Sequence, residues 1–257
     1  MPEHVAELPG PDLAHADIGI VYATKMEIAP FLDRCDRVRK YTGGKFVFHG
    51  GRLGDIKMAF VGCGMGFAPA RRATQALLDA HSPRWVISAG FSGALHPSLH
   101  VGDIVVATSL VDTHDQELHV DLKMPADPAK RLHVGRLLTV DHMVRLVTEK
   151  EELGQKYSAL AVDMESLSVA QVCRDSKTRF LAVRVISDDL AADLPPEILA
   201  VVGPSGGVRI GAAIASIWKR PGSVKEMWRL REQSNHAAER LAKFLDGVAV
   251  QLHAAKS

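Results

Sequence analysis

Short, wholly apolar runs alternate along this chain with longer stretches in which apolar residues recur every three or four positions. The short runs are typical of strands buried in a parallel sheet, and the longer stretches are typical of helices with one buried face. The predicted strands are Ile18–Ala23, Lys45–His49, Lys57–Val61, Arg84–Gly90, Asp103–Val111, Arg136–Asp141, Ala159–Asp163 and Arg179–Ser187. The predicted helices are Met26–Cys35, Ala70–Ala80, Met164–Arg174, Val208–Trp218 and Val224–Leu252.

Strands that alternate with helices predict an α/β fold, here one three-layer domain around a central, mostly parallel, twisted mixed sheet. Glycine-containing turns are expected at Gly50-Gly51 and Gly54-Asp55 in a hairpin, at Gly62–Gly66, and at Gly90-Phe91-Ser92-Gly93. No linker divides the chain. We therefore expect a flexible N-terminal arm over residues 1–16 and a domain over 17–257, in which 209–252 form a C-terminal helical extension.

Composition narrows the class of protein. The 257 residues carry 31 Lys plus Arg against 30 Asp plus Glu, a balance that excludes a generally basic nucleic-acid binder. Three scattered cysteines do not make a disulfide scaffold, and neither a secretory signal nor an apolar run of about 20 residues is visible. We expect a cytoplasmic enzyme or binding protein that takes a small molecule.

Candidate chemistry lies where the predicted strands end, because ligands of open α/β sheets bind at the carboxyl ends of the strands. Carboxylates gather there, whereas the spaced His and Cys pairs of a zinc site and the Gly-x-Ser-x-Gly of a nucleophile elbow are missing. Gly62, Gly64 and Gly66 form GxGxG with Phe67 at the place of the third glycine, and no GK[ST] occurs. By itself this cluster indicates a tight turn rather than a phosphate loop.

Three segments resemble the nucleoside phosphorylase and nucleosidase superfamily, and specifically its methylthioadenosine/S-adenosylhomocysteine nucleosidase branch. They are IGIVYATKMEIAPF, the run from CGMGFAPARR to VGDIVV, and the pair ALAVDMES and VRVISDD. Together they cover roughly residues 18–111 and 136–190. The resemblance implies the nucleoside phosphorylase-like fold, a nucleoside substrate and no metal or organic cofactor.

Residue by residue, the resemblance implies that Glu27 orients the attacking water and that Asp188 protonates N7 of the purine. A protonated purine leaves as a neutral group, and a positioned acid contributes about 10²–10⁴-fold to such a rate. Asp188 would have to carry a proton near neutrality, which requires an apolar or hydrogen-bonded pocket. Glu165 would accept hydrogen bonds from the ribose hydroxyls, and Met164 would pack under the sugar. Without the resemblance, a helix N-cap is the better interpretation of Asp188. Ordinary helix glutamates are the alternative for Glu27 and Glu165, and a core methionine is an equally good interpretation of Met164.

Further site residues follow from the same likeness. The resemblance implies base contacts for Gly93, Met143, Val144 and Ser187, and a loop that holds the nucleophile or an anion, formed by Gly64, Gly66, Gly90 and Ser92. Phe91 departs from the family pattern, because a small or hydroxyl residue usually stands there and helps to hold phosphate. Water is therefore favoured over phosphate as the nucleophile, with Arg52, Arg71 and Arg72 as candidates for an anion site.

The end of the chain allows two interpretations. Its segment 208–231 resembles the tail of hopanoid-pathway nucleoside phosphorylases, which act on an adenosyl group attached to a lipid. Residues 209–231 hold six basic side chains and one acid, with Trp218 and Trp228 among them. Such a helix suits peripheral contact with an anionic membrane, but a solvated helix face with buried tryptophans fits the same pattern.

The leading hypothesis is hydrolysis of the N-glycosidic bond of a 5′-modified adenine nucleoside, of the methylthioadenosine or S-adenosylhomocysteine type, with release of adenine. Phosphorolysis of a purine nucleoside or adenosyl-lipid is the first alternative, and a non-catalytic nucleoside-binding protein is the second. The resemblance also implies a homodimer.

Overall fold

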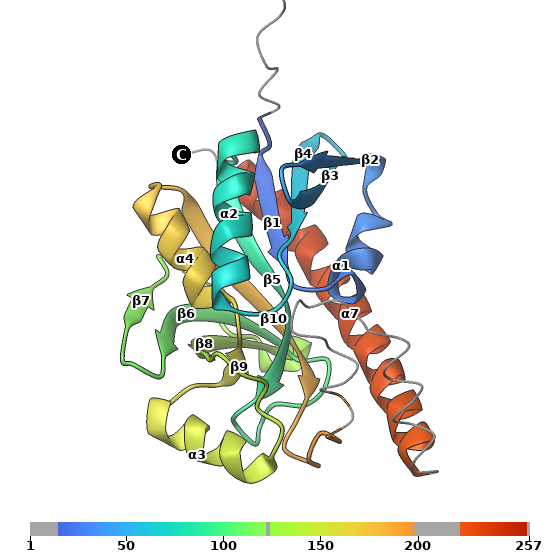
Figure 1. Cartoon of the computed structure of the whole chain (residues 1–257), viewed down its shortest axis with the longest axis vertical. Helices are drawn as coiled ribbons and strands as arrows, with labels where there is room; N and C mark the ends of the chain where they lie inside the picture. The colour runs from blue at the N-terminus through green and yellow to red at the C-terminus, as the bar shows by residue number, and fades with distance from the viewer. Residues whose placement is uncertain (1–14, 122–123, 197, 199–221, 256–257) are drawn as a thin grey trace, which may run out of the picture.

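The computed structural model describes residues 15–121, 124–196, 198 and 222–255 (Figure 1). Its strands are β1 Ile18–Tyr22, β2 Asp36–Gly43, β3 Phe46–Leu53, β4 Ile56–Gly62, β5 Trp85–Ala94, β6 Ile104–Asp112, β7 Glu117–His119, β8 Leu132–Thr139, β9 Ala161–Asp163 and β10 Arg179–Asp188. Its helices are α1 Lys25–Leu32, α2 Phe67–His81, α3 Val147–Tyr157, α4 Ser166–Asp175 and α7 Gly222–Ala254, with a 3-10 turn η1 at Pro128–Lys130.

One mixed sheet joins all of these strands. Its centre is parallel, because β4, β1, β5 and β10 pair side by side in the same direction. The antiparallel strands β3 and β2 extend one edge. On the other side β10, β6, β8, β9 and β5 pair in a closed ring, so this end of the sheet curls into a small barrel. The predicted α/β fold with a mixed sheet is confirmed.

Helices cover both faces of the sheet and make the three layers (Figure 1). Successive residues of β1 show the division, since side chains alternate between the faces of a strand. Ile20 packs in the cluster that holds Phe31 of α1 and Leu241 of α7. Val21 packs in the opposite cluster with Leu77 of α2, among residues contributed by α4.

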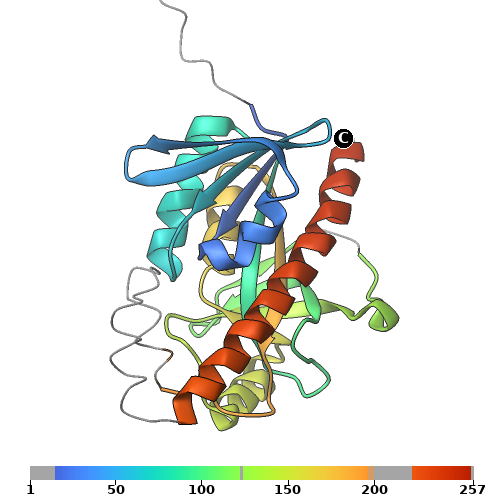
Figure 2. The ribbon, with the colours of Figure 1, turned by 90° about the vertical axis from the view of Figure 1, so that its right-hand side faces the viewer.

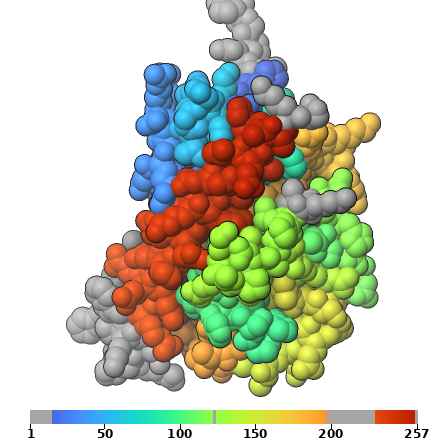
Figure 3. Space-filling model, turned by 180° about the vertical axis from the view of Figure 1, so that it is seen from behind, coloured from blue at the N-terminus to red at the C-terminus, as the bar shows by residue number. Residues whose placement is uncertain are grey.

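Helix α7 is 33 residues long and crosses one face of the molecule obliquely (Figures 2 and 3). Ion pairs from Arg34 to Glu239 (3.3 Å) and to Asp246 (2.8 Å) join it to the segment after α1. This helix spans the predicted helix Val224–Leu252. The predicted helix Val208–Trp218, and with it most of the basic segment 209–231, falls outside the described residues.

Two predicted turns are wrong, because the sheet continues through them. Gly50-Gly51 lies within β3, where Gly50 pairs with Ala59 and Gly51 with Met58, so only Gly54-Asp55 turns the hairpin. The run Gly90-Phe91-Ser92-Gly93 lies within β5 and pairs along β10. Small residues there serve close packing between strands rather than a change of direction.

The pattern of apolar residues does not predict α3, since seven of its eleven residues, VTEKEELGQKY, are polar or charged and suggest solvent-exposed chain. Its buried face consists of Lys150 and Tyr157, with Leu153 between them. At the beginning of the described chain, Ala16 is buried and its N–H donates to the carbonyl of His81 (3.1 Å), so the folded domain includes this last residue of the predicted arm. Within the described ranges, the helices are too short or too polar to cross a membrane.

Candidate active site

A cavity of about 520 Å³ opens where β1, β5, β8, β9 and β10 end. Nine of the predicted site residues line it, and they come from five separate parts of the chain. They are Glu27, Ser92, Gly93, Met143, Val144, Met164, Glu165, Ser187 and Asp188. The cavity therefore collects three carboxylates that lie as far as 161 residues apart in the sequence (188 − 27).

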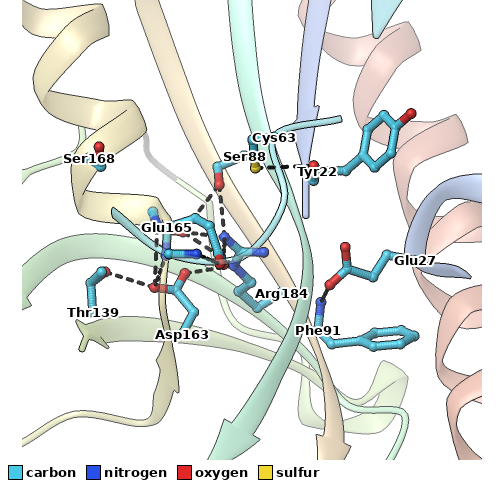
Figure 4. A network of polar contacts seen from close by, with 12 residues as sticks. Tyr22, Glu27, Cys63, Ser88, Phe91, Thr139, Asp163, Glu165, Ser168 and Arg184 are labelled. Carbon is cyan, nitrogen blue, oxygen red and sulfur yellow. Dashed lines mark hydrogen bonds and ion pairs between the residues drawn. The ribbon is translucent and has the colours of Figure 1, made fainter. Parts of the chain in front are cut away.

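Glu27 is fixed at the start of α1 and is almost completely buried. Its Oε2 accepts the backbone N–H of Thr24 (2.7 Å), and its Oε1 accepts the N–H of Phe91 (3.2 Å) (Figure 4). Burial raises the pKa of Glu27, although these two N–H groups and the nearby Arg184 favour the ionised form. A carboxylate poised in this way can accept a proton from a bound water molecule.

Arg184 is the residue that organises the centre of the site, although the sequence analysis did not select it. It lies on β10, is 1% exposed, and donates to Asp163 (2.7 Å) and to the hydroxyls of Ser88 and Ser166 (each 2.9 Å) (Figure 4). Burial disfavours its charge, but Asp163, Glu165 and Glu27 outweigh this and raise its pKa. Arg184 therefore stays a cation beneath the cavity.

Asp163 has a structural role. Its Oδ1 accepts the hydroxyl of Thr139 (2.7 Å) and its Oδ2 accepts Nε of Arg184 (2.7 Å), so both carboxylate oxygens have protein partners. Thr139 also accepts the N–H of Leu167 at the start of α4 (3.1 Å). These bonds fasten the ends of β8, β9 and β10 to one another and fix where α4 begins.

Glu165 occupies the N-cap position of α4 and is nearly as buried as Glu27. Its Oε1 accepts the N–H of Gly66 (2.8 Å), and its Oε2 lies 3.8 Å from Nη2 of Arg184. Burial raises the pKa of Glu165 to about 7; Arg184 opposes the rise, and Asp163 adds to it. The carboxylate has capacity left to accept two neighbouring hydroxyl groups, as the ribose role requires.

Asp188 accepts hydrogen bonds on both carboxylate oxygens, so of the two expected surroundings, apolar or hydrogen-bonded, the structure shows the second. Its Oδ2 accepts Nζ of Lys150 at 2.5 Å, and its Oδ1 accepts the hydroxyl of Ser187 at 2.6 Å. Lys150 comes from α3 and is 0% exposed, so a buried ammonium group stands directly behind the carboxyl group. Lys150 is not among the predicted site residues, because the helix that carries it is not predicted from the pattern of apolar residues.

Three of the predicted loop residues, Gly64, Gly66 and Gly90, lie outside the cavity wall. Gly66 has a φ of 102°, a conformation that favours glycine, and its N–H is the one that Glu165 accepts. A Cβ at Gly90 would lie 2.4 Å from Nη1 of Arg184 and 3.0 Å from Oε1 of Glu27. Glycine at this position lets the arginine and the glutamate approach each other across β5.

The proposed anion residues lie elsewhere. Arg52 binds Asp55 and nearby carbonyls, Arg71 lies 4.0 Å from Asp175, and neither they nor Arg72 line the cavity. Phe91 lines the cavity where the family usually places a small or hydroxyl residue, and the neighbouring hydroxyl of Ser92 is buried without a partner among the described residues. This wall is less suited to phosphate than to a neutral nucleophile.

The rest of the cavity wall is mainly apolar. Its members are Ala23, Met65, Val140, Met143, Val144, Val162, Met164, Leu194, Ile198 and Leu230. Such a wall suits an aromatic base held between flat or flexible side chains. His142 stands on the wall but is held by Asp141 and Glu149 (each 2.9 Å), which raise its pKa. His142 is therefore an exposed histidine with both ring nitrogens hydrogen-bonded.

Comparison with known families decides the affiliation. The model of the Phosphorylase superfamily matches residues 17–128 and 119–248, which is most of the chain. The protein belongs to this superfamily. Among curated superfamily members, the 5′-methylthioadenosine/S-adenosylhomocysteine nucleosidase of Maridesulfovibrio salexigens is 26% identical over 201 residues, which are 68% of this chain and 87% of that protein. The nucleosidase of the same name from Bacillus subtilis is 26% identical over 196 residues, 66% of this chain and 85% of the relative.

Solved structures support the superfamily fold. The Helicobacter pylori 5′-methylthioadenosine/S-adenosylhomocysteine nucleosidase, complexed with a pyrrolopyrimidine compound, matches with a TM-score of 0.65 and 23% identity, over 93% of this chain and 99% of that one. The Colwellia psychrerythraea nucleosidase in complex with adenine matches with a TM-score of 0.66 and 22% identity, over 93% and 96%. Futalosine hydrolase of H. pylori has the same fold, with a TM-score of 0.62 and 22% identity over 91% and 97%.

Two residues behind the cavity, Arg184 and Lys150, were not predicted as site residues although the sequence contains signs of them. Arg184 interrupts the apolar run Phe180–Ile186, and a charged residue inside a buried strand is a sign of a paired, functional group. Lys150 shares a helical face with Leu153 and Tyr157, a weaker signal in a stretch that is otherwise charged. Helix α7 also contributes to the cavity, through Leu230, Arg231 and Ser234. The neighbouring sequence does not indicate this contribution, because it depends on where the helix packs.

Proposed function

We propose that the protein hydrolyses the N-glycosidic bond of a 5′-modified adenine nucleoside and releases adenine. The observation that carries the proposal is that Glu27, Glu165 and Asp188 line one cavity. The nucleosidase relatives support this choice of reaction and of substrate class.

In this mechanism Glu27 accepts a proton from water as the water attacks the anomeric carbon. Positive charge develops on the ribose in the transition state, and the carboxylate of Glu165, bonded to the sugar hydroxyls, lies close enough to stabilise it. The bond from the sugar to N9 breaks with its electron pair going to the purine, and a proton delivered through Asp188 to N7 neutralises the leaving group. Met164 packs under the sugar, while Met143 and Val144 cover the base and Gly93 and Ser187 contact its edge.

The choice of water over phosphate rests on the wall at Phe91 and on the position of the three predicted anion-binding residues, Arg52, Arg71 and Arg72, outside the cavity. The experiment is adenine release from methylthioadenosine, S-adenosylhomocysteine, adenosine, inosine and uridine, each with and without phosphate. We expect release from the 5′-modified adenine nucleosides at equal rates in both buffers. Activity that appears only with phosphate would reverse the choice and favour the phosphorylase alternative.

Three variants separate an enzyme from a nucleoside-binding protein. Glu27→Gln and Asp188→Asn should lower kcat by about 10²–10⁴-fold while nucleoside affinity changes little. Glu165→Gln should lower both kcat and nucleoside affinity. Glu151→Gln, at an exposed position of α3, is the matched control and should behave as the wild type. A protein that binds nucleosides equally well with Asp188→Asn and shows no turnover in any form would be a binding protein.

We also propose that the protein is a cytoplasmic homodimer. The support is the family resemblance alone, and light scattering on the purified protein tests the assembly. Contact of segment 209–231 with an anionic membrane remains a separate hypothesis, which sedimentation with anionic vesicles at low salt would refute if the protein stays in solution.

A further inference from the structure

Two buried cations lie under the cavity, and they differ in one chemical property. Arg184 is 1% exposed and forms ion pairs with Asp163 and Glu165. Lys150 is 0% exposed and forms an ion pair with Asp188. Arginine keeps its proton at any pH at which the protein is folded, whereas a buried lysine can give its proton up. The fold therefore places a permanent charge beside Glu165 and an exchangeable proton beside Asp188.

The geometry around Lys150 is suited to proton exchange. Its Nζ lies 2.5 Å from Oδ2 of Asp188 and 3.3 Å from the carbonyl oxygen of Asp189. Asp188 lines the cavity but Lys150 does not, so the lysine stands behind the carboxyl group and contacts a ligand only through it.

Gly93 makes this close pairing feasible. It pairs with Asp188 across the bulged end of β5 and β10, where a Cβ would lie 3.0 Å from Oδ2 of Asp188 and 3.5 Å from Cε of Lys150. A glycine here leaves the space in which the lysine side chain reaches the carboxyl group. The position expected to contact the base thus also shapes the contact between the two charged groups.

We propose that Lys150, acting through Asp188, is the source of the proton that the departing purine receives; this inference rests on the proposed nucleosidase function. An N–H bond of the ammonium group breaks as an O–H bond forms on Asp188, and that proton passes to N7 while the C1′–N9 bond breaks. Lys150 ends as a neutral amine, and Glu27 has gained the proton of the attacking water. Solvent then returns a proton to Lys150 and accepts the one on Glu27, so the balance closes without any other reactant.

The groups that contact Lys150 are the carboxylate of Asp188 and the backbone carbonyl of Asp189, whose own carboxylate lies 4.0 Å from Nδ1 of His100. On α3 itself, Glu149 is bonded to His142. Across the cavity, Glu27, Asp163 and Glu165 surround Arg184.

The test is the pH profile of adenine release by the wild type, Lys150→Met and Lys150→Arg, with Lys156→Met as the control. Lys156 lies on the same helix but is exposed, with its Nζ over the ring of Tyr157. In the alkaline range, we expect the activity of Lys150→Met to fall at a pH at least about one unit lower than the pH at which wild-type activity falls. Lys150→Arg keeps the charge but cannot release a proton, and should be no more active than Lys150→Met.

A rescue experiment gives a second readout. Lys150→Ala removes the atoms of n-propylamine, and we expect this amine to restore activity in proportion to its concentration. An unchanged alkaline limb in Lys150→Met, or full activity in Lys150→Arg, would overturn the inference and leave the lysine a purely electrostatic or packing role. The wild-type protein alone gives a further test. If its kcat falls above about pH 5, as expected for an aspartic acid without a proton-donating partner, the inference is also overturned.

Failure of the inference and failure of the proposed function look different. A wild type that releases adenine from no nucleoside refutes the function, and the proton role falls with it. A wild type that is active, with Lys150 variants that keep its pH profile, refutes only the role of Lys150. Thermal unfolding of each variant identifies those that fail to fold. If a Lys150 variant fails to fold, the alkaline limb of the wild-type pH profile decides whether the inference holds.

Discussion

Replacing Arg184 by methionine removes the positive charge that Asp163, Glu165 and Glu27 share and leaves a side chain of similar length. The change deletes the bonds to Asp163 (2.7 Å) and Ser88 (2.9 Å) and the ion pair to Glu165 (3.8 Å). Breaking a buried ion pair by removing one partner costs about 3–5 kcal/mol, because the other charge stays buried without compensation. In a chain of this size that corresponds to a fall in Tm of about 6–20 °C.

The deficit should depend on pH. In the intact protein the pKa of Glu165 is raised from 4.5 to about 7, and Arg184 opposes the rise, so without the arginine the pKa of Glu165 goes higher still. A carboxyl group with a raised pKa binds a proton more tightly in the folded chain than in the unfolded chain. Its contribution to stability is complete below about pH 4.5 and is lost as the pH rises through the folded value. The free energy of unfolding of Arg184→Met should therefore be closer to the wild-type value at pH 5 than at pH 8.

Urea unfolding followed by circular dichroism at pH 5 and pH 8 measures both effects. Arg179→Met is the matched control, because Arg179 lies on the same strand but is exposed, with its guanidinium group 5.4 Å from the centre of the Trp85 ring. We expect the control to lose no more than about 1 kcal/mol, with no dependence on pH. A deficit for Arg184→Met below about 1 kcal/mol, or one equal at the two pH values, would refute the account of a shared buried charge.

Three further predictions concern the site. Gly90→Ala places a methyl group 2.4 Å from Arg184 and 3.0 Å from Glu27. The rate of adenine release, measured by steady-state kinetics, should therefore fall at least about tenfold. An unchanged rate would contradict the close packing of Arg184 and Glu27 across β5. Since Glu165 acts as a carboxylate with a pKa of about 7, kcat/KM should rise with pH through neutrality, whereas an acid limb near pH 4 would argue against its ionised role. Burial, with Glu165 and Glu27 nearby, raises the pKa of the Cys63 thiol well above its usual range, so iodoacetamide should label it much more slowly than free cysteine at pH 8; equal rates would disprove this.

The sequence by itself determined the fold class and the members of the site that stand at strand ends. The buried strands and amphipathic helices are local patterns, because the spacing of apolar residues is set by the geometry of each element. Glu27, Glu165 and Asp188 follow such elements, so their arrival at one edge of the sheet could be expected once the strands were placed in a single layer.

The tertiary structure alone decided what stands behind those carboxylates. Gly90-Phe91-Ser92-Gly93 resembles a turn until its pairing with β10 makes it a strand, and a pairing partner roughly 90 residues away leaves no local trace. Arg184 and Lys150 are charged residues whose burial is tolerated only because carboxylates from other elements meet them. The charge state of the site is therefore a property of packing between distant segments, and no segment of the sequence carries it alone.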